Sequence, residues 1–141
     1  MSWYAAHLVM FVEFKDTVQE QHPVWENIVL IGAASEEEAF EKAERHGRSA
    51  EGDECGSFRW GKKPAQWVFA GVRKLTECAM LSDVPGDGTE ISFNELELAS
   101  REDVRKLAQG KPVQVTLADR FPTTSRSGAD AESKARKRKP A

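Results

Sequence analysis

The chain has 141 residues, 40% of them hydrophobic, and a formal net charge of −3. This length and apolar share are typical of one globular domain, which excludes a wholly disordered or fibrous chain. Two cysteines are too few for a disulfide scaffold. The longest early apolar run, residues 3–12, is shorter than the roughly 20 residues of a membrane-spanning helix. We therefore expect a soluble, cytosolic protein with reduced thiols and no membrane partner.

Two apolar segments near the N-terminus predict a long hairpin. Residues 3–14 are apolar at every even position and at most odd positions, so both faces of this strand would be apolar. Residues 24–33 form a second strand after a short polar connection that Pro23 ends. A strand that is apolar on both faces is either covered on both sides or lies at an interface.

The sequence Ser35-Glu36-Glu37-Glu38 predicts the start of a helix. Ser35 can cap the first turn, and Glu38 completes a capping box three residues later. Gly47 is the expected end of this helix. The side chains expected to face the core are Ala39, Phe40, Ala43 and His46.

The second half of the chain predicts further alternating elements. After a loop over 48–64, residues 65–81 form a strand and residues 83–88 a turn. The strand over 89–98 changes its apolar phase, which suggests a bulge near Asn94. A helix starts at Ser100 and ends at Gly110, and a last strand covers 113–117. The inward side chains of that helix would be Val104, Leu107 and Ala108.

This order of elements, β-β-α-β-β-α-β, predicts an α+β fold in which a mostly antiparallel sheet carries two helices on one face. We expect a single domain over residues 1–121. Two short helices do not cover both faces of long strands. We therefore expect something else to shield the second apolar face of the sheet from water. The candidates are the loop around residues 58–60, a second copy of the chain, or a partner protein, and a homodimer is the commonest solution.

The last twenty residues differ in composition from the rest. Residues 122–141 contain six basic and two acidic residues and no Leu, Ile, Val, Phe or Trp. Such a segment cannot offset the entropy of ordering, which predicts a disordered tail of charge +4 on a body of charge −7. Clustered basic residues bind phosphates without sequence preference, so the tail could associate with nucleic acid; the alternative is a solvated tail. The candidate residues are Lys134, Arg136, Lys137, Arg138 and Lys139.

Three motifs occur in a characteristic order. They are Trp3-Tyr4-Ala5-Ala6-His7-Leu8, Ser35-Glu36-Glu37-Glu38-Ala39 and Trp67-Val68-Phe69-Ala70-Gly71-Val72. In this order and spacing, the chain resembles a family of small bacterial proteins known only as a domain of unknown function (family 4288), over roughly residues 3–98. The resemblance implies a small bacterial cytosolic protein. The family has no established activity, so it supplies no catalytic residue.

Motifs that carry chemistry are absent from the sequence. There is no phosphate-binding loop, nucleophile elbow or metal-ligand spacing of His and Cys, so we expect no metal and no cofactor. His7 lies between apolar neighbours in a strand. It could act as a general base, but a buried, hydrogen-bonded histidine is the more common occupant of such a position.

Two main hypotheses for function follow. The first is a non-enzymatic protein-interaction module with an acidic body and an apolar sheet face, whose partner is a basic protein or a second copy. The alternative is a small-ligand-binding protein or enzyme with a pocket between the sheet and the 48–64 loop. The candidate residues of these hypotheses are Trp3, His7, Phe11, Trp25, Phe58, Arg59, Trp60, Trp67, Arg73 and Glu77.

Overall fold

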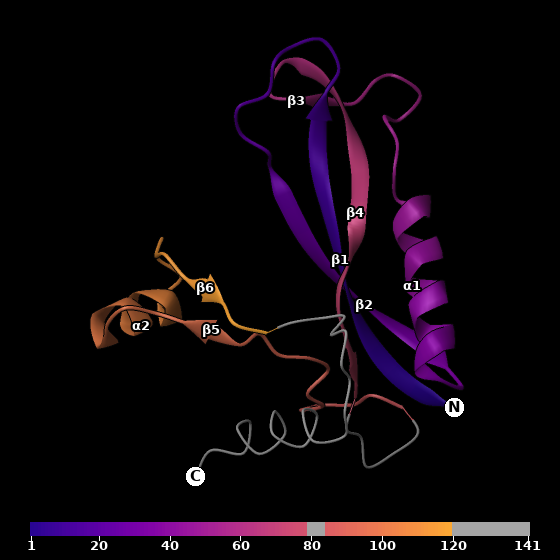
Figure 1. The fold of residues 1–141 in the computed structure, drawn as a ribbon, viewed down its shortest axis with the longest axis vertical. Coiled ribbons are helices and arrows are strands. Elements are labelled where there is room, and N and C mark those ends of the chain that lie inside the picture. The colour runs from indigo at the N-terminus through magenta and orange to yellow at the C-terminus, as the bar shows by residue number, and fades with distance from the viewer. Residues whose placement is uncertain (79–83, 120–141) are drawn as a thin grey trace.

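The computed structural model describes residues 1–78 and 84–119. Its elements are β1 (Ser2–Phe14), β2 (Val24–Ala33), α1 (Glu36–Ser49), β3 (Arg59–Trp60), β4 (Lys63–Glu77), β5 (Leu96–Glu97), α2 (Arg101–Ala108) and β6 (Thr116–Leu117). The predicted α+β fold with a mostly antiparallel sheet is confirmed (Figure 1). The predicted domain end at Phe121 and the tail from residue 122 lie outside the described residues. Within the described part, no helix is both long enough and apolar enough to cross a membrane.

The main sheet is antiparallel, with the strand order β2-β1-β4-β3. The predicted hairpin of β1 and β2 is confirmed, and its register runs from Ser2 opposite Ala33 to Phe11 opposite Val24. The 48–64 segment is not a loop throughout, because β3 and the start of β4 lie within it. β4 begins two residues before the predicted strand and ends at Glu77. Of the rest of that predicted strand, Cys78 is not part of a strand and residues 79–81 lie outside the described residues.

β4 contains two irregularities that the sequence did not predict. His7 lies opposite Lys74 and Leu8 opposite Val72, so Arg73 is an extra residue in β4. A second register shift follows two residue pairs further on, between Val9 and Met10 of β1. It lies beside Gly71, whose φ of 152° is a backbone conformation that favours glycine. A bulge bends its strand and re-aims side chains. The consecutive residues Arg73 and Lys74 consequently reach the same carboxylate, as described below.

The core lies between α1 and one face of the sheet. Its buried side chains come from the even positions of β1, from β2, from α1 and from β4, and they are Tyr4, Ala6, Leu8, Ile31, Ala33, Ala39, Ala43 and Val72. The predicted helix cap is confirmed, because Ser35 Oγ accepts a hydrogen bond from the Glu38 amide at 3.1 Å. The predicted inward side chains Ala39 and Ala43 are buried in this core, and Phe40 packs against it. The prediction is wrong for His46, which is exposed because it lies on the outer side of the helix.

The prediction that Gly47 ends α1 is wrong, since the helix continues to Ser49. Gly47 is buried, and its missing side chain makes room for the ring of Phe69 on β4. A Cβ atom placed at Gly47 would lie 2.4 Å from that ring. The glycine therefore serves close helix–sheet packing rather than termination.

Overpacking usually costs about 1–3 kcal/mol, and the 2.4 Å approach to an aromatic ring places Gly47→Ala toward the upper end of that range. A gain of about 1 kcal/mol in helix propensity offsets part of this cost, so the free energy of unfolding is expected to fall by roughly 1–2 kcal/mol. Urea denaturation measures the change, and Phe69→Leu in the same chain should restore part of it by making room for the new methyl group. A variant as stable as the parent would contradict this account.

The segment after the main sheet departs most from the sequence-based predictions. The strand predicted over 89–98 is reduced to β5 and the strand predicted over 113–117 to β6, which pair as Leu96 with Leu117. The expected bulge near Asn94 is wrong, because residues 89–95 form no strand. Their polar groups instead bond to side chains of β1 and β4, as the site below explains.

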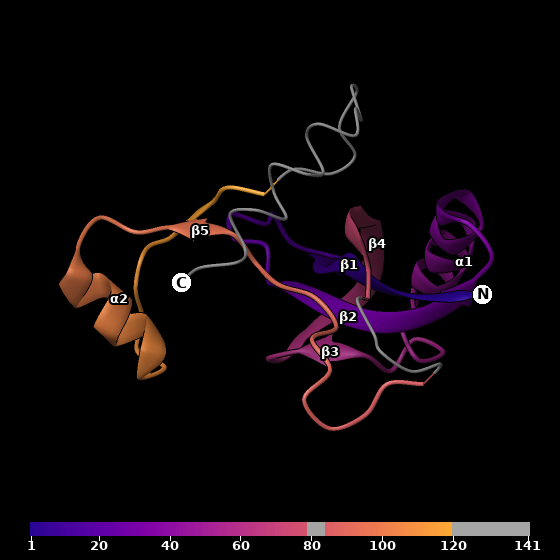
Figure 2. The ribbon, with the colours of Figure 1, turned by 90° about the horizontal axis from the view of Figure 1, so that it is seen from below.

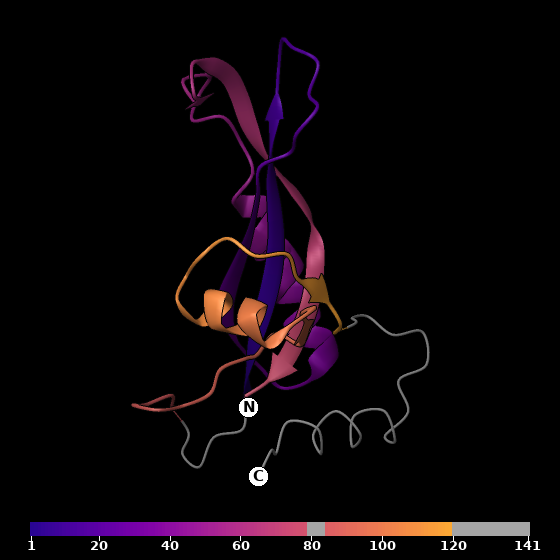
Figure 3. The ribbon, with the colours of Figure 1, turned by 90° about the vertical axis from the view of Figure 1, so that its left-hand side faces the viewer.

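We call residues 95–119, which contain β5, α2 and β6, the arm. Figures 2 and 3 show the arm on the side of the sheet opposite α1. Ser100 caps α2 as predicted, accepting from the Asp103 amide at 3.1 Å. The predicted inward stripe of α2 is wrong, because none of its residues is buried. Val104 and Leu107 on α2 are instead 51% and 40% exposed. The predicted stop at Gly110 is confirmed, since this glycine follows the helix end with a φ of 75° and the Lys111 amide donates to the Lys106 carbonyl at 2.9 Å.

Candidate functional site

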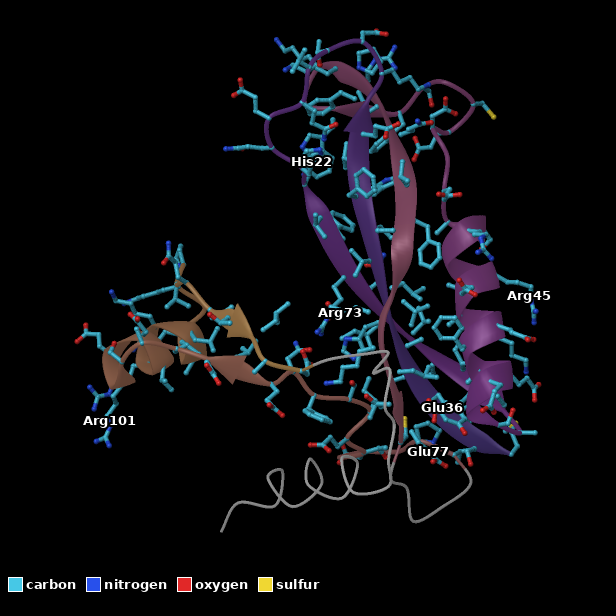
Figure 4. All side chains as sticks on the ribbon, in the orientation of Figure 1. His22, Glu36, Arg45, Arg73, Glu77 and Arg101 are labelled. Carbon is cyan, nitrogen blue, oxygen red and sulfur yellow. The ribbon has the colours of Figure 1, made fainter. Side chains whose placement is uncertain are left out.

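Charged side chains gather on the sheet face opposite α1. They are His7 from β1, Glu26 from β2, Arg73 and Lys74 from β4, and Asp119 at the end of the arm, and we call these five the charged cluster. Figure 4 shows Arg73 about halfway along the sheet, directed away from α1 toward the arm. The odd positions of β1 face this side, and the bulge in β4 directs Arg73 toward it.

His7 is completely buried and uses both ring nitrogens. Nδ1 lies 2.8 Å from Glu26 Oε2, and Nε2 lies 2.5 Å from Ser92 Oγ. An ionised carboxylate only accepts hydrogen bonds, so Nδ1 carries a proton. In the neutral ring, Nε2 then accepts the hydroxyl proton of Ser92. The expectation of a buried, hydrogen-bonded histidine is confirmed.

Glu26 is held by two donors. Arg73 donates from Nε to Oε1 and from Nη2 to Oε2, the latter over 2.9 Å, in a bidentate pair. Burial raises the pKa of Glu26, but the hydrogen bonds from Arg73 and His7 outweigh burial and hold this pKa below its usual range. The hydrogen bonds to Glu26 in turn raise the pKa of Arg73 against the effect of burial. Glu26 is thus ionised at neutral pH.

Asp119 bridges the two cations of β4. Its Oδ1 accepts from Arg73 Nη1 at 2.6 Å and its Oδ2 from Lys74 Nζ at 2.8 Å. Burial raises the pKa of Asp119, yet the hydrogen bonds from Lys74 and Arg73 outweigh it and lower this pKa to about 2. The two cations Arg73 and Lys74 thus face the two carboxylates Glu26 and Asp119, so their charges balance, which suits a buried position.

Two side chains of β4 and the residue that follows it, Cys78, hold the segment around Ser92. Cys78 Sγ donates to the carbonyl of Ile91 at 3.4 Å, and Lys74 Nζ donates to the carbonyl of Phe93 and lies 3.5 Å from the centroid of its ring. One residue further, Asn94 Oδ1 accepts from Arg73 at 3.1 Å. Cys78 itself is buried. These contacts place Ser92 between His7 and Thr76, whose Oγ1 lies 3.4 Å from Ser92 Oγ.

Of the candidate residues from the sequence, only His7 and Arg73 belong to the charged cluster. The sequence did not point to Ser92, which is 85 residues from His7 and has no surrounding motif. It also missed Glu26, Lys74 and Asp119. Glu26 and Lys74 lie near His7 because of how β2 and β4 pair with β1. The sequence alone does not reveal this proximity, because it does not give the strand register.

Four aromatic candidates form a separate group on the other face of the sheet. Trp25 and Trp67 lie opposite Met10 and Val12, which are even positions of β1. Ring centroids in this group are 5.0 to 6.4 Å apart. The members of this aromatic group are Trp25, Phe58, Trp60 and Trp67.

The remaining candidates are dispersed. Arg59 donates to the carbonyls of Gly56 and Phe58 in its own loop, and Glu77 lies opposite Tyr4 at the other end of the sheet. Because Phe58 and Trp60 of the 48–64 loop pack on Trp67, which lies opposite Val12, this part of the loop lies on the face opposite the charged cluster. Trp3 and Phe11 occupy odd positions of β1, on the cluster's face, and are half-buried. The basic candidates from Lys134 to Lys139 lie outside the described residues, so nucleic-acid binding by the tail stays a prediction.

Metal ligation has no geometric support in residues 1–78 and 84–119. No group of three or more His, Cys, Asp and Glu side chains in these ranges is arranged to hold a metal ion. In the charged cluster, the carboxylates are instead bound to Arg73 and Lys74.

These features define a small α+β domain with a long hairpin, one packed helix and a buried ionic cluster. The family model described as Domain of unknown function (DUF4288) matches residues 3–92, more than half of the chain. The chain belongs to this family, as the three sequence motifs indicated, although the match ends at residue 92 rather than near 98. Comparisons with curated proteins and with solved structures gave no match.

Proposed function

We propose that this protein is an interaction module that assembles with a second copy of itself along the free edge of β2. The observation that carries the proposal is the composition of that edge. β2 is the outer strand of the main sheet, and no strand among residues 1–78 and 84–119 pairs with its other side.

An edge strand offers unpaired backbone groups to other chains, and monomeric proteins protect such strands with lysine, proline or bulges. β2 has ten residues and contains neither lysine nor proline. Its one charged residue, Glu26, is bound to His7 and Arg73. Apolar side chains along it are exposed, with Val24 at 55%, Ile28 at 44% and Leu30 at 40%. A second strand would cover this surface and satisfy the backbone.

A second copy fits this edge better than a strongly charged partner does. Antiparallel pairing of β2 with itself would bring apolar residues together and leave each Glu26 with its own partners. The arm adds exposed apolar residues on the same side of the sheet, including Val104 at 51% and Leu117 at 52%. Those residues would enlarge the apolar area that a dimer removes from water.

Leu30→Lys is expected to weaken this dimer at least about tenfold, because a lysine on an edge strand has to lose hydration when the edge is paired. The matched control is Val18→Lys, which makes the same charge change at a residue that is 91% exposed in the β1–β2 connection. Sedimentation velocity over a concentration series gives the dissociation constants. A parent protein that stays monomeric at about 100 µM, or equal effects of both variants, would contradict the proposal.

A further inference from the structure

We propose that Ser92 is an activated nucleophile for acyl transfer, with His7 as its general base and Glu26 as the carboxylate that positions the imidazole. This activity goes beyond the proposed self-association and does not depend on it. It also differs from the non-enzymatic role that the sequence favoured, because the sequence could not bring Ser92 and His7 together.

A hydroxyl, an imidazole and a carboxylate lie in the order that activates a serine. Ser92 Oγ is 2.5 Å from His7 Nε2, and His7 Nδ1 is 2.8 Å from Glu26 Oε2. The ionised Glu26 requires the proton on Nδ1, which directs the lone pair of Nε2 toward the hydroxyl group of Ser92. Such a chain of nucleophile, base and positioning carboxylate recurs on unrelated folds and is recognised by geometry rather than by sequence order.

His7 and Ser92 differ in their exposure to solvent. His7 is shielded from solvent, whereas Ser92 is only half-buried, so a substrate would approach from the serine side. The contacts from Lys74 and Arg73 to the two following residues, Phe93 and Asn94, hold the serine in place before substrate arrives. Such preorganisation removes an entropic cost from the reaction. Ser92, His7 and Glu26 all fall within the family match, whereas Asp119 lies beyond it.

The reaction class is the hydrolysis of uncharged carboxylic esters. Ser92 Oγ attacks the acyl carbon while its proton moves to His7 Nε2, and the bond from that carbon to the alcohol oxygen breaks as His7 protonates the leaving alcohol. Water then attacks the acyl-serine, His7 takes its proton and returns it to Ser92, and the carboxylic acid leaves. An uncharged substrate is expected because the carboxylates of Glu26 and Asp119 already neutralise Arg73 and Lys74.

The first test is covalent labelling of the full chain with a fluorophosphonate probe, followed by peptide mass spectrometry. We expect phosphonylation at Ser92, its loss in Ser92→Ala, and unchanged labelling in the control Ser57→Ala, which removes an exposed hydroxyl group in the 48–64 loop. The labelling rate should depend on pH, because His7 has to accept the serine proton. Glu26→Gln should change this pH profile, because the imidazole loses the carboxylate beside Nδ1. No adduct at Ser92 after prolonged exposure would overturn the proposal.

A second measurement does not require replacement of His7 or Glu26. In Ser92→Cys, the new thiol can transfer its proton to His7 and form a thiolate–imidazolium pair. Iodoacetamide should then alkylate residue 92 at least about tenfold faster at pH 7 than Cys55, the exposed cysteine of the same chain, which serves as the internal reference. Alkylation of residue 92 at the rate of Cys55 or slower would also overturn the proposal.

Discussion

Replacing Glu26 with glutamine is expected to lower the free energy of unfolding by about 3 kcal/mol, within the range seen when one partner of a buried ion pair is removed. Glu26 accepts hydrogen bonds from His7 and from two nitrogens of Arg73. A neutral amide weakens all three bonds and turns one acceptor into a donor that faces other donors. Arg73 would keep Asp119 as a charged partner, which limits the loss.

Urea denaturation at neutral pH measures this change, with Glu44→Gln as the matched control. Glu44 makes an ion pair with Arg48 on the surface of α1 at 3.4 Å, and such exposed pairs contribute at most about 0.5 kcal/mol. Equal effects of the two substitutions would mean that the charged cluster does not stabilise the fold. A large loss for Glu26→Gln alone supports a structural contribution of the cluster in addition to the proposed chemistry.

The elements predicted correctly from sequence depend on signals close together in the chain. The β1–β2 hairpin follows from two alternating segments joined by a short polar connection, and the start of α1 follows from Ser35 and Glu38. The error at Gly47 arose because the same residue type serves helix ends and close packing. Only the position of the Phe69 ring distinguishes the two roles.

The charged cluster could not be predicted, because its members come from four distant segments. The extra residue at Arg73 changes the alternation of β4, and strict alternation would have placed Arg73 and Lys74 on opposite faces. Residues 89–95 read as a strand because they are apolar at alternate positions. This segment is instead held against the sheet by side-chain hydrogen bonds from Arg73, Lys74 and Cys78, and it makes no strand-to-strand backbone pairing.

Asp119→Asn is expected to destabilise the protein by about 2 kcal/mol at neutral pH, with an effect that disappears in acid. The pKa of Asp119 falls from 3.8 to about 2 because Lys74 and Arg73 bind its ionised form, and one pKa unit corresponds to about 1.4 kcal/mol. A lowered pKa in the folded state means that the stabilisation is complete above about pH 4 and is lost as the pH falls through 2. The stability difference between the parent and Asp119→Asn should therefore shrink between pH 4 and pH 2.

Urea denaturation between pH 7 and pH 2 measures that difference, and hydrogen exchange locates it. Because Asp119 fixes the end of the arm to β4, the amides of residues 95–119 should exchange faster in the variant at neutral pH. Asp16→Asn, a substitution at an exposed position in the β1–β2 connection, should give no pH-dependent difference. If the difference in the free energy of unfolding between the parent and Asp119→Asn stays constant across this pH range, the effect of the carboxylate comes from its packing rather than from its charge. The ionic anchor of the arm would then be contradicted.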